Sequence, residues 1–164
     1  MKKFIIDADT GSDDAVAILL ALLHPQTEVL GITVVSGNVP LAQGITNTLS
    51  TIEIAEQDVK VYAGAEKPLV RDYIEIHTLE EFTEHVKSLS PVSASAQSVH
   101  GVDGMGDIGI VSKSKKNEET GAVDYLIKTI NNNPGEITLV TLGPLTNIAL
   151  AIKKDPSISS KIDH

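Results

Sequence analysis

Residues 3–23, KFIIDADTGSDDAVAILLALL, combine a short apolar run, a polar turn rich in aspartate and a longer apolar segment. The run at 3–6 has no polar alternation, which is typical of a strand that is buried on both faces of a parallel sheet. The turn DADTGS at 7–12 follows it. Residues 13–23 then predict a helix whose acidic first turn suits the helix dipole. This stretch therefore predicts a buried strand, a turn and a helix in succession.

The rest of the chain repeats this alternation of strands and helices. Further strands are predicted at 29–35, 59–62 and 136–142, and helices at 41–57, 120–131 and 144–154, with a weaker helical pattern at 79–89. Such alternation is typical of βαβ units, so we expect an α/β fold: an open, mainly parallel, Rossmann-like sheet with helices on both faces. Residues 1–164 are predicted to form a single domain, with a long mobile loop region at 65–120.

Charge and composition exclude several classes of function. The 164 residues include 13 basic and 22 acidic ones, and the net charge is -9, which disfavours binding to nucleic acid or to an anionic membrane surface. The absence of cysteine excludes disulfides and thiolate chemistry and fits a cytoplasmic protein. The longest apolar run, at 15–23, is far shorter than the roughly 20 residues of a membrane span.

Four carboxylates gather where the first predicted strand ends. Asp7, Asp9, Asp13 and Asp14 lie within DADTGSDD, at the edge of an open α/β sheet where ligands bind. Carboxylates packed so closely repel one another and have raised pKa values unless a cation neutralises them. Oxygen ligands of this kind suit a hard cation, Ca²⁺ or Mg²⁺. The alternative is that Asp13 and Asp14 only decorate a helix whose N-cap is Ser12, while the other two are solvated loop residues.

Three further residues follow predicted strands or lie in the loop region. Asn38 in SGN follows the second strand and would place an amide over the same edge, or would be an ordinary turn residue. At Leu142, before Gly143 and Pro144, a backbone carbonyl could bind a metal, or the segment could simply start a helix. His100 could serve the site or be a solvated surface residue.

Five segments together resemble one protein family. They are DADTGSDDA at 7–15, VVSGNV at 34–39, VYAGAEKPL at 61–69, HGVDGMG at 100–106 and TLGPLTNIALA at 141–151. In their order and spacing they are similar to the calcium-dependent nucleoside hydrolases of the inosine-uridine preferring type. The resemblance extends over essentially the whole chain and implies hydrolysis of the N-glycosidic bond of a ribonucleoside by a calcium-bound water, giving free base and ribose.

The resemblance also implies a role for each candidate metal residue. Asp9 would be a calcium ligand and the general base toward the water. Asp14 would be a second calcium ligand, and the backbone carbonyl of Leu142 would complete this part of the metal shell. Asp7 would support the cluster.

The remaining implied roles concern the substrate. Asp13 would hold a ribose hydroxyl, Asn38 would lie beside the ribose, and His100 would lie near the leaving base. The resemblance further implies a homo-oligomer with a place in purine or pyrimidine salvage, and leaves the preferred base open.

Two alternatives remain at this stage. Family members run to about twice this length, so the chain corresponds to the N-terminal half of their fold, and it could be a non-catalytic fragment or remnant that binds calcium or ribose weakly. The segment Ile5 to Thr10 also partly fits the DxDxT opening of haloacid-dehalogenase-type phosphatases, in which Asp7 would be the nucleophile and Asp9 the acid/base.

Overall fold

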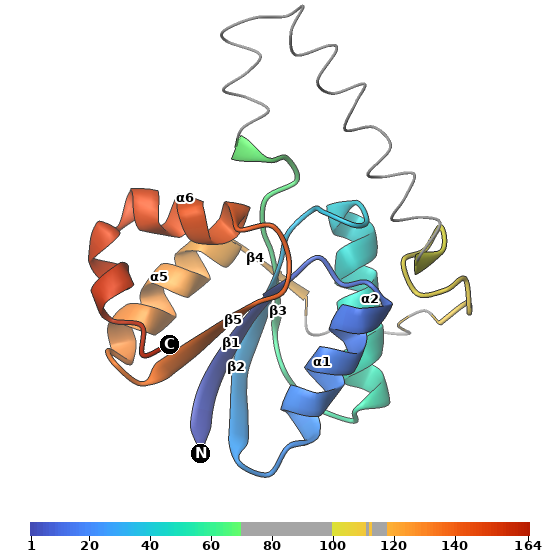
Figure 1. Cartoon of the computed structure of the whole chain (residues 1–164), viewed down its shortest axis with the longest axis horizontal. Helices are drawn as coiled ribbons and strands as arrows, with labels where there is room; N and C mark the ends of the chain where they lie inside the picture. The colour runs from blue at the N-terminus through green and yellow to red at the C-terminus, as the bar shows by residue number, and fades with distance from the viewer. Residues whose placement is uncertain (70–99, 111, 113–117) are drawn as a thin grey trace, which may run out of the picture.

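The chain forms strands and helices in near-regular alternation (Figure 1). The computed structural model describes residues 1–69, 100–110, 112 and 118–164. In chain order the elements are β1 (Lys2–Ala8), α1 (Ser12–Leu23), β2 (Thr27–Val34), α2 (Leu41–Ile54), β3 (Val61–Ala63), β4 (Glu118–Thr120), α5 (Ala122–Asn132), β5 (Ile137–Thr141), α6 (Thr146–Lys154) and the short 3-10 helix η1 (Pro156–Ser160). The helical pattern at 79–89 lies outside the described residues.

A five-stranded parallel sheet forms the centre of the fold. Its strand order is β4-β3-β2-β1-β5, and every neighbouring pair is parallel. β1 therefore lies between β2 and β5, so the turns that follow these three strands open at the same edge of the sheet. The predicted α/β fold with an open parallel sheet is confirmed.

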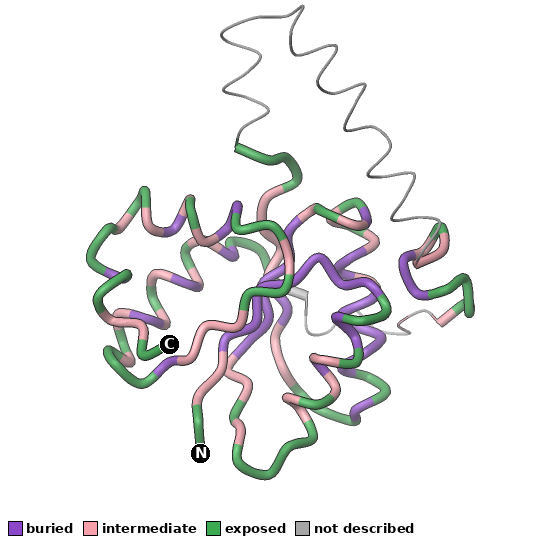
Figure 2. Tube along the Cα trace, viewed as in Figure 1, coloured by how far each residue is buried: buried purple, intermediate pink, exposed green. Residues whose placement is uncertain are grey.

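Helices cover both faces of the sheet, as expected (Figure 1). One apolar core joins Ile6 and Ile32 of the sheet to Ile18 of α1 and Leu49 of α2. The other core joins Ile5 to side chains of β5, α5, α6 and η1. Ile5 and Ile6 are neighbours on β1 and point to opposite faces, so this strand is buried on both sides from Ile5 onward. Buried residues gather in the middle of the sheet (Figure 2).

The structure also corrects two boundaries and adds one strand. β1 continues through Asp7 and Ala8, which the sequence analysis placed in the turn, because both residues pair with β2. α2 ends at Ile54 rather than at 57, and Glu56 has a positive φ of 53°. The short strand β4 within the predicted loop region was missed, because its sequence Glu-Glu-Thr has no apolar pattern and it forms by backbone pairing with the edge of β3.

The last residues extend the sheet at its other edge. Ile162 forms a parallel bridge with Ile137 of β5, and Leu139 N–H donates to the carbonyl of His164 at 2.8 Å. Residues 162–164 thus occupy the position of a further parallel strand. Within the described ranges, no helix has the length and apolar character needed to cross a membrane.

Candidate active site at the carboxyl edge of the sheet

Asp7 is the most deeply buried carboxylate of the site. Its exposed fraction is 0%, and its Oδ1 accepts hydrogen bonds from Thr33 Oγ1 and, at 2.8 Å, from Asn147 Nδ2. Its Oδ2 is buried without a hydrogen-bond partner. Burial raises the pKa of Asp7 to about 6, and the nearby charge of Asp9 adds to this. A carboxylate so enclosed is not exposed to a substrate, as the nucleophile of the phosphatase alternative would have to be.

Asn147, in the first turn of α6, holds three segments together. Besides Asp7, its Nδ2 donates to Val34 O at 3.1 Å, and its Oδ1 accepts from Ala65 N at 2.8 Å. The side chain is fully buried. A Cβ at Gly64 would lie only 2.3 Å from Asn147 Oδ1, so the chain after β3 can approach this amide only through a glycine. One amide thus joins the ends of β1, β2 and β3 to α6.

Asp9 lies at the junction of the turns that follow β1, β2 and β5. The backbone N–H of Asn38 donates to Asp9 Oδ2 at 2.6 Å, and Asp9 is 3% exposed. A Cβ at Gly37 would lie 2.1 Å from Oδ2, and one at Gly143 would lie 2.8 Å from Oδ1. Gly37 and Gly143 therefore leave room for the carboxylate of Asp9, and a side chain at either position would displace it.

The side chain of Asp14 binds the backbone at the start of its own helix, α1. Its Oδ2 accepts a hydrogen bond from Gly11 N at 2.9 Å, and Gly11, rather than Ser12, is the N-cap of α1. Burial raises the pKa of Asp14 to about 6, the charges of Asp9 and Asp13 raise it further, and His100 opposes the shift. The side chain of Asp13 is 74% exposed. The two aspartates therefore differ: Asp14 faces the cluster and Asp13 faces solvent.

His100 lies against the start of α1. Its Nδ1 is 3.0 Å from Ser12 Oγ and 3.9 Å from Asp13 Oδ1, and its side chain is 16% exposed. This placement favours a role in the site over that of a solvated loop residue. The histidine comes from a segment 88 positions further along the chain than Ser12.

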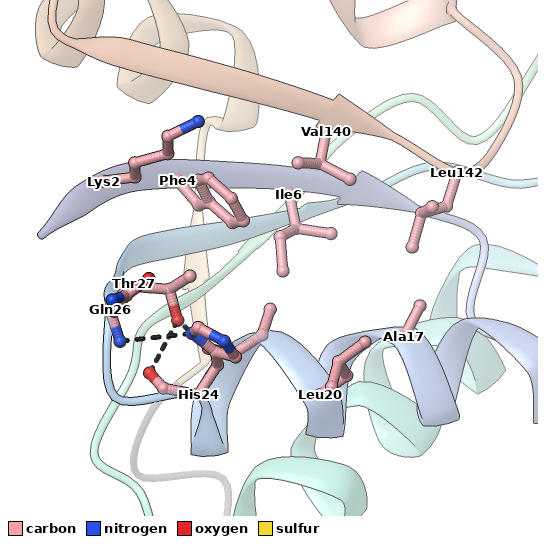
Figure 3. Close-up of a pocket in the computed structure, with 11 residues that line it drawn as sticks. Lys2, Phe4, Ile6, Ala17, Leu20, His24, Gln26, Thr27, Val140 and Leu142 are labelled. Atoms are coloured by element: carbon pink, nitrogen blue, oxygen red, sulfur yellow. Dashed lines mark hydrogen bonds between the residues drawn. The ribbon is translucent and has the colours of Figure 1, made fainter.

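Leu142 contributes its backbone to the site and its side chain to a neighbouring groove. Its N–H donates to Asp7 O at 2.8 Å. Its side chain lines an apolar groove of about 500 Å³ between α1 and the adjoining face of β1 and β5, opposite Leu20 (Figure 3). Phe4, Ile6 and Val140 form the sheet side of the groove. The predicted backbone role of Leu142 is therefore compatible with its apolar side chain.

The donor set suits a hard cation but is only part of a metal shell. Asp9 and Asp14 are buried, and the charge of Asp9 acts on Asp14. Asp9 also lies beside Gly143, in the turn that follows Leu142. Among the described residues, no three His, Asp or Glu side chains are arranged to hold a metal ion. Calcium takes about six to eight oxygen ligands. The oxygen donors present are therefore fewer than a hard cation of this kind takes.

The sequence analysis missed the buried side chains that support the carboxylates. Thr33 and Asn147 hold Asp7, and Thr10 Oγ1 lies 2.7 Å from Thr48 Oγ1 of α2. The only available signal for Asn147 was a polar residue at the start of the apolar helix segment NIALA. Its partner Asp7 is 140 positions away, so no local pattern links them.

Replacing Asn147 by leucine, which has a similar volume, should destabilise the fold strongly. The change leaves Val34 O, Ala65 N and one side of the buried Asp7 without partners. We expect a loss of about 3 kcal/mol or more in the free energy of unfolding, measured by urea denaturation. Asn131→Leu is the matched control, because Asn131 bonds to Asp155 and Lys161 at the periphery; its cost should be below about 1 kcal/mol. Equal costs for the two variants would contradict the central place of Asn147.

The raised pKa of Asp14 predicts that Asp14→Asn increases the stability of the metal-free chain, by an amount that depends on pH. A pKa that is higher in the folded than in the unfolded chain means that folding favours protonated Asp14. The contribution of this group to the free energy of unfolding is therefore complete below about pH 4 and is lost as the pH rises through 6. Asparagine can still accept the Gly11 hydrogen bond. At pH 7.5 the variant should be more stable by about 2 kcal/mol, and this advantage should vanish near pH 4. The exposed Asp13→Asn should show a much smaller gain. Destabilisation at pH 7.5 would overturn this assignment.

Comparison with known proteins shows what the chain is related to. Residues 4–164 match the family described as inosine-uridine preferring nucleoside hydrolase. The chain is 39% identical over 162 residues to uridine nucleosidase 1 of Arabidopsis thaliana, covering 98% of this chain and 43% of that protein. It is 37% identical over 161 residues to the pyrimidine-specific ribonucleoside hydrolase RihB of Escherichia coli, covering 98% of this chain and 45% of that protein.

A solved structure gives the same result. The purine-preferring ribonucleoside hydrolase from Gardnerella vaginalis superimposes with a TM-score of 0.80 at 33% identity, covering 99% of this chain and 46% of that one. The chain therefore spans less than half the length of the relatives it matches. Four hydrogen bonds join all five sequence segments at one edge of the sheet: Asn38 with Asp9, His100 with Ser12, Ala65 with Asn147, and Asn147 with Asp7. The chain belongs to the inosine-uridine preferring nucleoside hydrolase family.

Proposed function

We propose that this chain carries the metal- and ribose-binding half of a site that hydrolyses the N-glycosidic bond of ribonucleosides. The observation that carries the proposal is the buried carboxylate of Asp9, enclosed by Gly37, Asn38 and Gly143 beside a second buried carboxylate, Asp14. Folded proteins avoid burying neighbouring carboxylates because each raises the other's cost of ionisation. Such a pair is retained where a cation or a developing positive charge offsets that cost.

Calcium is the cation that fits the proposal. Asp9, Asp14 and the backbone carbonyl of Leu142 would hold it, and ligands from outside the described residues would complete the shell. When bound, calcium supplies positive charge that acidifies water and binds sugar hydroxyls. The supporting role of Asp7 follows from its contacts, since it is tied to Thr33 and Asn147 and its backbone carbonyl accepts from Leu142 N–H.

Asp9 is the residue best placed to act as the general base. Asn38 N–H fixes the orientation of its carboxylate, which is the condition for efficient proton transfer. In the reaction, the water oxygen bonds to the anomeric carbon as the bond from this carbon to the base breaks, and Asp9 takes the water proton. The base departs with the bonding electron pair. The carboxylates around the sugar stabilise the positive charge that develops on it.

The remaining site residues would bind the nucleoside. Asp13 is solvent-exposed at the mouth of the cluster and can accept a hydrogen bond from a ribose hydroxyl. His100 stands beside it and would face the leaving base, with Asn38 next to the ribose. Names of relatives at 33–39% identity include a uridine nucleosidase, a pyrimidine-specific hydrolase and a purine-preferring one. Both base classes are therefore candidate substrates.

One observation favours a second candidate. The chain spans less than half the length of its relatives, and its described residues hold only part of a metal shell. A domain of this kind would bind calcium or ribose weakly without turnover. Measuring activity separates the two candidates.

Release of free base from inosine and uridine tests the proposal. We expect calcium-dependent release by the wild-type chain, abolished by chelation and reduced about a hundredfold or more by Asp9→Asn, which keeps the shape but removes the base. Asp124→Asn is the matched control, since Asp124 lies on α5, pairs with Lys154 and should not affect turnover. A folded wild-type chain that releases no base at high protein concentration would contradict catalysis and favour the weakly binding domain.

A further inference from the structure

Asn47 lies in the middle of α2 and bridges two loops. Its Nδ2 donates to Thr10 O at 2.9 Å and to Asp103 O at 2.8 Å, while its Oδ1 accepts from Gln43 Nε2 at 2.9 Å. Its exposed fraction is 1%. A side-chain amide carries two N–H protons, and here each binds a backbone carbonyl of a different loop. Asn47 therefore fastens the turn after β1 to the segment 100–107.

Hydrogen bonds within the segment 100–107 hold it as one unit, so a contact that fixes the carbonyl of Asp103 also fixes the rest of the segment. Asp103 Oδ1 accepts from Met105 N at 2.7 Å and from Asp107 N at 2.9 Å, and Gly106 N donates to His100 O at 2.6 Å. Asp107 in turn accepts from two backbone N–H groups of the same segment. His100 therefore moves together with the carbonyl that Asn47 holds.

The absence of a side chain at Gly104 allows the segment to come close enough for the hydrogen bond between Asn47 and Asp103. Gly104 has a φ of +77°, and a Cβ there would lie 2.5 Å from Val39 Cγ1 and 3.3 Å from Asn47 Nδ2. On the other side, a Cβ at Gly11 would lie 3.6 Å from Gly104 O and 3.6 Å from His100 Cγ. The segment thus packs against the start of α1 through the backbone of Gly104 and the ring of His100, at a distance set by Asn47.

We propose that Asn47 is a positioning residue that holds His100 beside Ser12 and Asp13 by joining the carbonyls of Thr10 and Asp103. The consequence for catalysis, placement of His100 against the leaving base of a nucleoside, rests on the proposed function. The geometric part does not, because the contacts of Asn47 and of His100 with Ser12 exist without substrate. Asn47 is 1% exposed and binds backbone carbonyls, so it acts only through the loops.

Two substitutions and a control test the geometric part. Asn47→Leu keeps a similar side-chain volume but removes the N–H donors. Asn47→Asp keeps the shape of the side chain but places a carboxylate oxygen, which cannot donate, against both carbonyls. Thr51→Val is the matched control: Thr51 is equally buried on α2, but its hydroxyl bonds only to Asn47 O within the helix. Amide exchange of residues 101–107 should accelerate about tenfold or more in both Asn47 variants. The nuclear Overhauser contact between the His100 ring and the Ser12 β-protons should disappear, while the control keeps both signals.

Unchanged exchange and an unchanged His100–Ser12 contact in Asn47→Leu would overturn the proposal. If both Asn47 variants fail to fold, Gly104→Ala provides the second route, because its methyl group forces the segment away from Val39 and Asn47 while α2 stays intact. Loss of the His100–Ser12 contact in this variant supports the proposal, and its retention overturns it.

A double-substitution cycle tests the catalytic consequence. With inosine or uridine, Asn47→Leu should lower kcat about ten- to a hundredfold. In a His100→Ala background the same substitution should have almost no further effect, because its effect passes through His100. An equal loss in both backgrounds would mean that Asn47 only stabilises the fold and would overturn its positioning role. Absence of turnover in the wild-type chain would contradict the proposed function alone, since exchange and Overhauser measurements still decide the position of His100.

Discussion

The hydrogen bond from Asn147 to Asp7 is the constraint on which the site depends. β1 lies between β2 and β5, and Asp7 is its last side chain but one, buried where water cannot solvate it. Because Asn147 also binds Val34 O and Ala65 N, the same amide sets the positions of the chain after β2 and β3. Asp9 then lies two residues beyond Asp7, among turns whose positions this contact determines. Cooperative polar networks of this kind are stable only when nearly every member has a partner.

The site is built at a cost to the stability of the metal-free fold. Burial raises the pKa values of Asp7 and Asp14 to about 6, so both are held as carboxylates at neutral pH against their surroundings. Glycines 37 and 143 give Asp9 its space by omitting side chains. These features lower the stability of the fold, and under the proposed function they pre-organise oxygen ligands for a cation. Functional sites commonly contain residues whose arrangement lowers the stability of the fold.

Much of the fold and of the candidate site could be predicted from local sequence patterns. Apolar runs of strand and helix period located β1, α1, β2 and β5, and the cluster of aspartates indicated a candidate site at the carboxyl edge of the sheet. The short strand β4 could not be predicted, since backbone pairing with β3 and not side-chain pattern forms it. Asn47 and Asn147 were missed for another reason: a single amide within a helix is locally unremarkable, and its partners lie tens of residues away or more. Predicting such contacts requires the tertiary structure.

The apolar groove and the carboxylate cluster meet just after the end of β5. Leu142 links the two features, because its backbone binds Asp7 and its side chain lines the groove. Calorimetric titration of calcium into the metal-stripped chain tests most directly whether the carboxylates already form a competent half-site. The account predicts specific binding in the micromolar range that is lost in Asp14→Asn and kept in Asp124→Asn. Absence of binding, or equal binding by the Asp14 variant, would contradict it.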